Sequence, residues 1–200
     1  MSRIPPFSRR TFLKGLSLAP LSRIPSGGPA PGEEPPTRAR KEGELSLTVD
    51  GKKLRLRVEA RTTLLELLRD RLGNTAAKEV CDLGACGACT VLLNGELVNA
   101  CMTLAMSCEG AKVLTVRGLG TPQKPHPLQK AFVSEDALQC GYCTPGMVLA
   151  AYALLEKNKN PSRREIQEAL AGNLCRCGTY TRIFEAVERA AAELRQGRGK

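Results

Sequence analysis

The 200-residue chain has no tryptophan, one histidine and only 4% aromatic residues. So few aromatic rings argue against a surface on which nucleic-acid bases stack, because such surfaces depend on aromatic side chains. The sequence also lacks a long apolar segment, since its longest apolar run, residues 146–155, is about half of what crosses a membrane. We therefore expect neither a nucleic-acid-binding domain nor a membrane-spanning helix.

A strong excess of one charge is missing from most of the chain. The 30 lysines and arginines outnumber the 20 acidic residues, but residues 1–41 alone hold eight basic residues against two glutamates. The other residues hold 22 basic and 18 acidic side chains. A DNA-binding domain would need a basic stripe on its folded part, and this distribution argues against one. With 42% hydrophobic residues, the chain can still bury a core.

The first forty residues resemble an export signal. Residues 8–14 read SRRTFLK and precede a short, weakly apolar stretch. Paired arginines before an apolar segment are the twin-arginine export pattern, so we expect Arg9 and Arg10 to direct the chain to the periplasm. A disordered basic tail is the alternative, because the apolar stretch is short and no clear cleavage site follows it. Five prolines and three glycines in residues 25–41 predict a flexible linker, so residues 1–43 are expected to be leader and linker.

Residues 44–118 show the pattern of short strands around one helix. Apolar and polar residues alternate on both sides of Asp50-Gly51 and again around Asn94-Gly95, which predicts two β-hairpins. Between them, residues 63–66 read TLLE, a capping box that opens a short helix ending near Gly73. Residues 112–116 predict one more strand. The pattern indicates a small α+β domain.

Residues 125–196 show a helical period instead, after a connection rich in proline and glycine. Helices are expected over residues 128–135, 145–157 and 182–195, and another after the capping box of residues 162–165, which read SRRE. Four helices of this length suit a compact bundle. The predicted fold class is therefore α+β, with a mixed N-terminal domain and a helical C-terminal domain.

Cysteine is what the chain has in excess: nine cysteines indicate a metal or disulfide framework. Four of them, Cys81, Cys86, Cys89 and Cys101, have the spacing of a plant-type ferredoxin with a [2Fe–2S] cluster. Glycine and alanine fill much of the loop, so it can wrap tightly and aim backbone N–H groups at the cluster sulfurs. Such hydrogen bonds stabilise negative charge and tune the reduction potential.

A second set of four is Cys140, Cys143, Cys175 and Cys177. It combines a C-x-x-C at the start of one predicted helix with a C-x-C in the turn between two later helices. Four thiolates from two helix ends can hold another [2Fe–2S] cluster, and the positive end of the helix near Cys143 would favour an anionic group.

Other interpretations of these cysteines stay open on spacing alone. Four thiolates also hold structural zinc, and exported chains commonly form disulfides, although two tight sets of four favour metal. A thioredoxin-like role for Cys140 and Cys143 would need a βαβ pattern, which the surrounding sequence does not show. Cys108 belongs to neither set and is expected to be a small buried side chain. His126, between two prolines, is expected to be a loop residue.

Three motifs together resemble the iron–sulfur subunit of the xanthine oxidase-type molybdenum hydroxylases. They are CDLGACGACTV at residues 81–91, QCGYCTPG at residues 139–146 and GNLCRCGTY at residues 172–180. The resemblance covers about residues 44–195, and the three motifs occur in the family's order. Among the members, the chain is most similar to the exported aldehyde oxidoreductase subunits that carry a twin-arginine leader.

The resemblance implies a β-grasp ferredoxin-like domain followed by a four-helix bundle, each with one [2Fe–2S] cluster. It also implies a large partner subunit with molybdopterin that oxidises an aldehyde or hydroxylates an N-heterocycle. A third subunit with FAD, or a cytochrome, would accept the electrons. The second set of cysteines would lie nearer the molybdenum, with Gln139 hydrogen-bonded to the pterin, and the first set nearer the acceptor. No residue of this chain would be catalytic, because its part in the oxidoreductase is electron transfer.

A stand-alone ferredoxin-like carrier or a zinc-bound interaction module is the alternative function. A lone carrier would need no second set of cysteines, yet residues 125–196 form a helical domain around one. The second set therefore favours the electron-transfer subunit.

Overall fold

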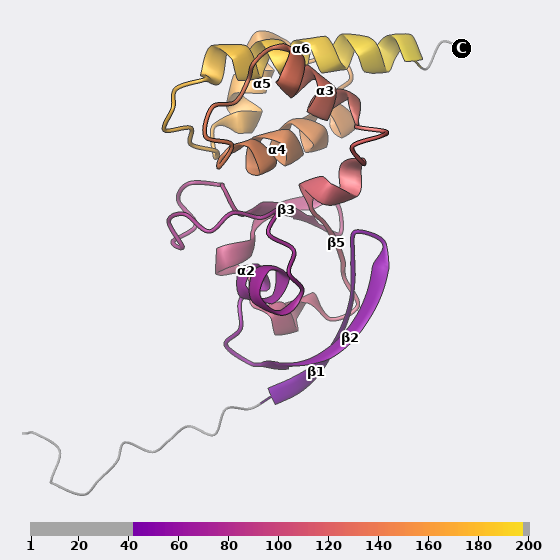
Figure 1. Cartoon of the computed structure of the whole chain (residues 1–200), viewed down its shortest axis with the longest axis vertical. Helices are drawn as coiled ribbons and strands as arrows, with labels where there is room; N and C mark the ends of the chain where they lie inside the picture. Colours follow the sequence, from indigo (N-terminus) through magenta and orange to yellow (C-terminus); the bar gives the residue numbers. More distant parts are fainter. Residues whose placement is uncertain (1–41, 198–200) are drawn as a thin grey trace, which may run out of the picture. The chain divides into compact units, whose positions relative to one another are not determined.

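A mixed five-stranded sheet occupies the first half of the described residues, 42–197, in this computed structural model (Figure 1). The predicted leader lies almost entirely outside these residues. The sheet has the order β2-β1-β5-β3-β4, in which β1 and β5 are parallel and the other neighbours antiparallel. The strands are β1 (Glu42–Val49), β2 (Lys52–Glu59), β3 (Thr90–Leu93), β4 (Glu96–Asn99) and β5 (Lys112–Leu114).

Both predicted β-hairpins are confirmed. Asp50 and Gly51 join β1 to β2, and Asn94 and Gly95 join β3 to β4, all four with positive φ angles between 47° and 91°. Two consecutive left-handed residues make a two-residue turn whose twist matches that of the strands. The turns therefore set the register that buries the alternate apolar residues of β1.

A short helix crosses from the first hairpin towards the second. It runs as α2 (Leu64–Glu66) and continues with π-helical bonding as η2 (Leu67–Arg71). The predicted capping box is confirmed, because the Thr63 hydroxyl accepts from the N–H of Glu66, whose carboxylate accepts from the N–H of Thr63. Its four leucines are buried in the core of the sheet. Three 3₁₀ segments follow: η3 (Ala100–Met102), η4 (Ala105–Cys108) and η5 (Val116–Leu119).

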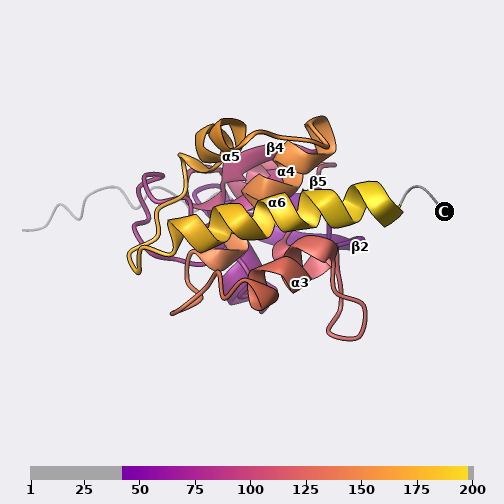
Figure 2. The same cartoon turned by 90° about the horizontal axis from the view of Figure 1, so that it is seen from above.

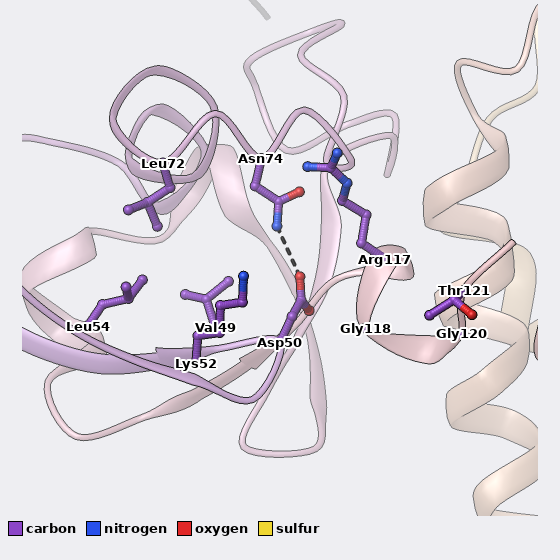
Figure 3. Close-up of a pocket in the computed structure, with 10 residues that line it drawn as sticks. All are labelled: Val49, Asp50, Lys52, Leu54, Leu72, Asn74, Arg117, Gly118, Gly120 and Thr121. Carbon is purple, nitrogen blue, oxygen red and sulfur yellow. Dashed lines mark hydrogen bonds between the residues drawn. The ribbon is translucent and has the colours of Figure 1, made fainter. Parts of the chain in front are cut away.

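The strand predicted over residues 112–116 is too long. β5 ends at Leu114 because Thr115 begins the η5 segment, where its hydroxyl accepts from the N–H of Arg117. The carboxylate of Asp50 accepts from both the N–H and the hydroxyl of Thr115, each at 2.7 Å. It also accepts from the buried amide of Asn74 at 3.0 Å, in the wall of the pocket in Figure 3. This network ties the first hairpin to the connection that leads out of the sheet.

The four predicted helices are present, each starting within two residues of its predicted start. They are α3 (Pro127–Ser134), α4 (Thr144–Lys157), α5 (Arg163–Leu170) and α6 (Tyr180–Gly197). The capping box of Ser162 and Glu165 at α5 is confirmed. All four helices contribute to one hydrophobic core, and α6 packs mainly on α3 (Figure 2). Among residues 42–197, no helix is both long and apolar enough to span a membrane.

His126 has a role that its place between two prolines did not reveal. Its ring nitrogen Nδ1 accepts from the backbone N–H of Leu128 at 3.2 Å. The backbone N–H of His126 donates to the side-chain oxygen of Gln129 at 2.8 Å, so His126 caps helix α3. The ring lies edge-on to Tyr152 of α4, with the ring centres 5.5 Å apart. Burial lowers the pKa of His126, which keeps Nδ1 free to accept the capping bond.

The sheet and the helices pack directly on each other. Leu92 of β3 is buried against Leu149 and Ala153 of α4, with Val116 and Leu119 of η5 beside them. Figure 1 shows α4 next to β3 at this contact. Residues 42–197 accordingly belong to one compact unit.

Candidate metal centres

The first set of cysteines comes together because β3 and β4 are paired. Cys89 directly precedes β3 and Cys101 comes two residues after the end of β4, where Thr90 lies opposite Asn99. The Sγ atoms of Cys89 and Cys101 are 3.4 Å apart. The side chains of Cys81 and Cys86 also interact, and the charge of Cys86 acts on Cys89. The four thiols thus converge as two pairs.

The thiols of Cys81 and Cys89 differ in how readily they ionise. The N–H of Leu83 donates to Sγ of Cys81 at 3.4 Å and is the main reason that the pKa of this thiol falls to about 7. Burial raises the pKa of the Cys89 thiol to about 11. A buried thiol ionises at neutral pH only when a cation or hydrogen bonds compensate its charge. The set therefore combines a thiol ready to bind metal with one that needs the metal to become a thiolate.

The second set shows the same contrast. The side chains of Cys143, at the start of α4, and Cys175 interact with each other, and Cys140 lies close enough to act on Cys143 through its charge. Burial raises the pKa of Cys143 to about 12. Burial also acts to raise the pKa of Cys175, but hydrogen bonds, chiefly with the Thr179 hydroxyl at 3.3 Å, bring it down to about 7.

Cys177 is the last member of the second set. It is exposed, and in the part of the chain that the structure describes it makes no hydrogen bond to Cys140, Cys143 or Cys175. Only Arg176 separates it from Cys175, so its backbone already lies beside the set.

The donor chemistry fits [2Fe–2S] clusters. Two irons take four thiolates in pairs, whereas one zinc ion takes four around a single point. The hydroxyl of Thr144, next to Cys143, is buried without a hydrogen-bond partner among residues 42–197. A buried hydroxyl requires a hydrogen-bond acceptor, and a sulfur of a bound cluster would supply one.

The ligand loops of the two sets are residues 78–89 for the first set and residues 139–143 and 172–177 for the second. They touch each other, which their sequence separation gave no reason to expect. The N–H of Leu174 donates to the carbonyl of Cys86 at 2.9 Å, and the side-chain amide of Asn173 donates to the carbonyl of Gly87 at 2.8 Å. Helix α4 approaches so closely that a Cβ on Gly146 would lie 2.2 Å from the Gly87 oxygen. The place of Asn173 just before two ligands was the only sequence signal for this contact.

Exposed apolar side chains surround both ligand loops. Leu83 is 76% exposed and Tyr142 56% exposed, and Val80, Met102 and Leu174 are also exposed. Gln139, predicted to contact a pterin, is exposed too, and its amide makes no hydrogen bond among residues 42–197.

Cys108 lies in the core of the sheet, as expected. It is fully buried, and its thiol faces the carbonyl of Leu104 at 3.6 Å. Burial raises its pKa, so it remains a neutral packing side chain.

Comparison with known proteins matches both halves of the chain to iron–sulfur families. A family described as "2Fe-2S iron-sulfur cluster binding domain" matches residues 47–113, and one described as "[2Fe-2S] binding domain" matches residues 115–188. The aldehyde oxidoreductase iron-sulfur-binding subunit PaoA of Escherichia coli O157:H7 is 42% identical over 187 residues, which cover 86% of this chain and 78% of PaoA.

Two further matches cover most of the folded residues. The nicotinate dehydrogenase small FeS subunit of Eubacterium barkeri is 44% identical over 146 residues, which cover 73% of this chain and 93% of that subunit. The crystal structure of quinoline 2-oxidoreductase from Pseudomonas putida 86 superposes with a TM-score of 0.74 at 40% identity, over 78% of this chain and 98% of the matched chain. The chain thus has two [2Fe–2S]-binding domains and an electron-transfer role, and it belongs to the iron–sulfur subunits of the xanthine oxidase-type molybdenum hydroxylases.

Proposed function

We propose that the chain carries electrons from a molybdopterin-containing partner subunit to FAD or another acceptor, such as a cytochrome. In this proposal Cys140, Cys143, Cys175 and Cys177 hold the inner cluster, near the molybdopterin, and Cys81, Cys86, Cys89 and Cys101 hold the outer one. When bound, each [2Fe–2S] cluster supplies a site that accepts and releases one electron. The reaction of the complex would be the oxidation of an aldehyde or of an N-heterocycle, carried out in the partner subunit.

The observation that carries the proposal is the hydrogen bond between the two ligand loops. The N–H of Leu174, next to Cys175, donates to the carbonyl of Cys86 at 2.9 Å. This single bond connects a proposed ligand of the inner cluster with a proposed ligand of the outer cluster through backbone atoms alone. An arrangement of two cluster sites in series supports transfer through the chain rather than two independent functions.

The proposed contacts with partners lie on the exposed surface of the ligand loops. Gln139 and Tyr142 belong to the C-x-x-C loop, and the free amide of Gln139 can donate to and accept from a pterin ring. Leu83 and Met102 are exposed beside the first set of cysteines, so we assign that side to the flavin subunit or other acceptor.

The order of the two sites is tested by removing one ligand at a time in the assembled complex. Cys86→Ser is expected to abolish the outer cluster, so substrate still reduces the molybdenum and the inner cluster but turnover with an external acceptor collapses. Cys143→Ser is expected to block both. Cys108→Ser is the matched control, since this thiol belongs to neither set. Normal turnover by the Cys86→Ser complex would show that electrons leave by another path.

We also propose export to the periplasm by the twin-arginine route. The pair Arg9-Arg10, which precedes a short apolar stretch, supports it. This route carries folded proteins, which protects clusters assembled on reduced thiols from an oxidising compartment. Replacing both arginines by lysine should keep the protein in the cytoplasm at unchanged charge. Normal appearance of that variant in the periplasm would overturn the assignment.

The domain boundaries follow from the two cores. We propose a leader and linker over residues 1–43, a β-grasp ferredoxin-like domain over residues 44–118 and a four-helix bundle over residues 125–196. The first core lies within residues 45–113 and the second within residues 128–191, which supports the division.

A further inference from the structure

Asn173 is a buried amide that lies between the two ligand loops. The residue is only 6% exposed. Its Nδ2 donates to the carbonyl of Gly87 at 2.8 Å and lies 3.3 Å from the hydroxyl of Thr90. Its backbone N–H donates to the carbonyl of Leu170 at 2.9 Å. Asn173 thus joins the end of helix α5 to the start of strand β3.

The acceptor of this bond has a fixed position. The carbonyl of Gly87 also accepts from the hydroxyl of Thr90 at 2.7 Å and from its N–H at 3.2 Å. Gly87 follows Cys86, so the peptide groups that accept from Asn173 and from Leu174 are consecutive. Any shift of Gly87 relative to Asn173 therefore also changes the distance between Cys86 and Leu174.

Another contact between the loops is weaker. Nζ of Lys78 lies 5.9 Å from the ring centre of Tyr142, a cation–π contact at the edge of the usual range. Tyr142 is 56% exposed, so solvent competes with this contact. A hydrogen bond from a buried amide to a buried carbonyl has no such competition.

We propose that Asn173 is a positioning residue that holds the two cluster-binding loops at a fixed separation and so sets the coupling between the two clusters. The inference rests on the proposed function, because it takes the eight cysteines as ligands. Asn173 itself binds neither cluster in this proposal. It acts through the Gly87 carbonyl, which keeps the Leu174–Cys86 bond short.

The test uses the full chain loaded with both clusters and reduced so that both are paramagnetic. The magnetic splitting between the two reduced clusters falls steeply with their separation and needs no turnover. In Asn173→Asp, a carboxylate oxygen replaces the amide donor and repels the Gly87 carbonyl, so we expect the splitting to shrink or vanish while both signals remain. The rate of electron transfer between the clusters is expected to fall in the same variant.

Asn74→Ala is the matched control. Asn74 is also a buried asparagine, but its amide donates to Asp50 (Figure 3) and to Thr115. We expect this variant to be less stable yet to keep the wild-type splitting. An equal loss of splitting in Asn74→Ala would mean that general loosening, and not Asn173, changes the coupling, and would overturn the inference.

Three further outcomes of this test lead to different conclusions. A wild-type protein without two cluster signals would overturn the proposed function itself. Two signals with an unchanged splitting in Asn173→Asp would overturn only the role of Asn173. If Asn173→Asp fails to take up iron, Asn173→Ala replaces it, because this change removes the same amide donor without adding a charge. A weaker splitting in Asn173→Ala would support the inference, and an unchanged one would refute it.

Discussion

Replacing Gly146 by alanine should destabilise the protein because helix α4 contacts the ligand loop of the first set at Gly87. An alanine Cβ would lie 2.2 Å from the Gly87 oxygen and 2.8 Å from Nδ2 of Asn173, both shorter than real Cβ contacts allow. The closer atom belongs to the backbone of a ligand loop, so it cannot turn away as a flexible side chain would. The loop and the helix would have to separate by most of an ångström.

The net effect is the difference of two contributions. Forcing an extra carbon into a packed contact costs about 1–3 kcal/mol. Alanine is a better helix former than glycine by up to about 1 kcal/mol, and Gly146 lies in the first turn of α4. We therefore expect a loss of about 1–2 kcal/mol, which for a chain of this size lowers Tm by about 2–8 °C.

Gly172→Ala is the matched control for this prediction. Gly172 lies in the other ligand loop, one residue before Asn173, and a Cβ there would meet nothing within 4 Å. Its φ lies outside the left-handed region, so alanine should stabilise the chain by about 0.4–1 kcal/mol through the unfolded state. Thermal unfolding followed by circular dichroism compares the two variants. A Tm for Gly146→Ala equal to or above that of Gly172→Ala would refute the close contact between α4 and Gly87.

Three more predictions concern single side chains. Thr144→Val removes a hydroxyl that has no partner among the described residues, so the cluster-free chain should lose no stability, while a redox titration should find a lower potential for the inner cluster only. Cys108→Ser should cost about 1 kcal/mol in denaturant unfolding, because it buries a hydroxyl in the core, and should leave iron content unchanged. The pKa of His126 is below its ordinary 6.5, so the unfolded chain binds the proton more tightly, and stability should fall as pH drops below about 6.5. His126→Asn, which keeps a capping side chain without this titration, should flatten that dependence.

The sequence by itself determined the local structure and the kinds of ligand. The turns at Asp50-Gly51 and Asn94-Gly95 and the capping boxes depend on residues a few positions apart, so their patterns predicted both hairpins and the starts of helices. The spacing of the first four cysteines predicted one [2Fe–2S]-binding domain in the same way, and the resemblance of three motifs to a known family predicted the second. The strand predicted over residues 112–116 was too long, because Thr115 caps the η5 segment although its place in the sequence continues the alternation of a strand.

The tertiary structure alone decided how the two cysteine sets meet. Asn173 and Gly87 are 86 positions apart, and no periodicity along the chain relates them. Their contact depends on the packing of Leu92 of β3 on Leu149 of α4. This packing brings the start of α4 into contact with the loop that precedes β3. The same holds for the contact of His126 with Tyr152, which depends on the packing of α3 on α4. Packing between elements sets these distances, and packing depends on side chains far apart in sequence that only the folded chain brings together.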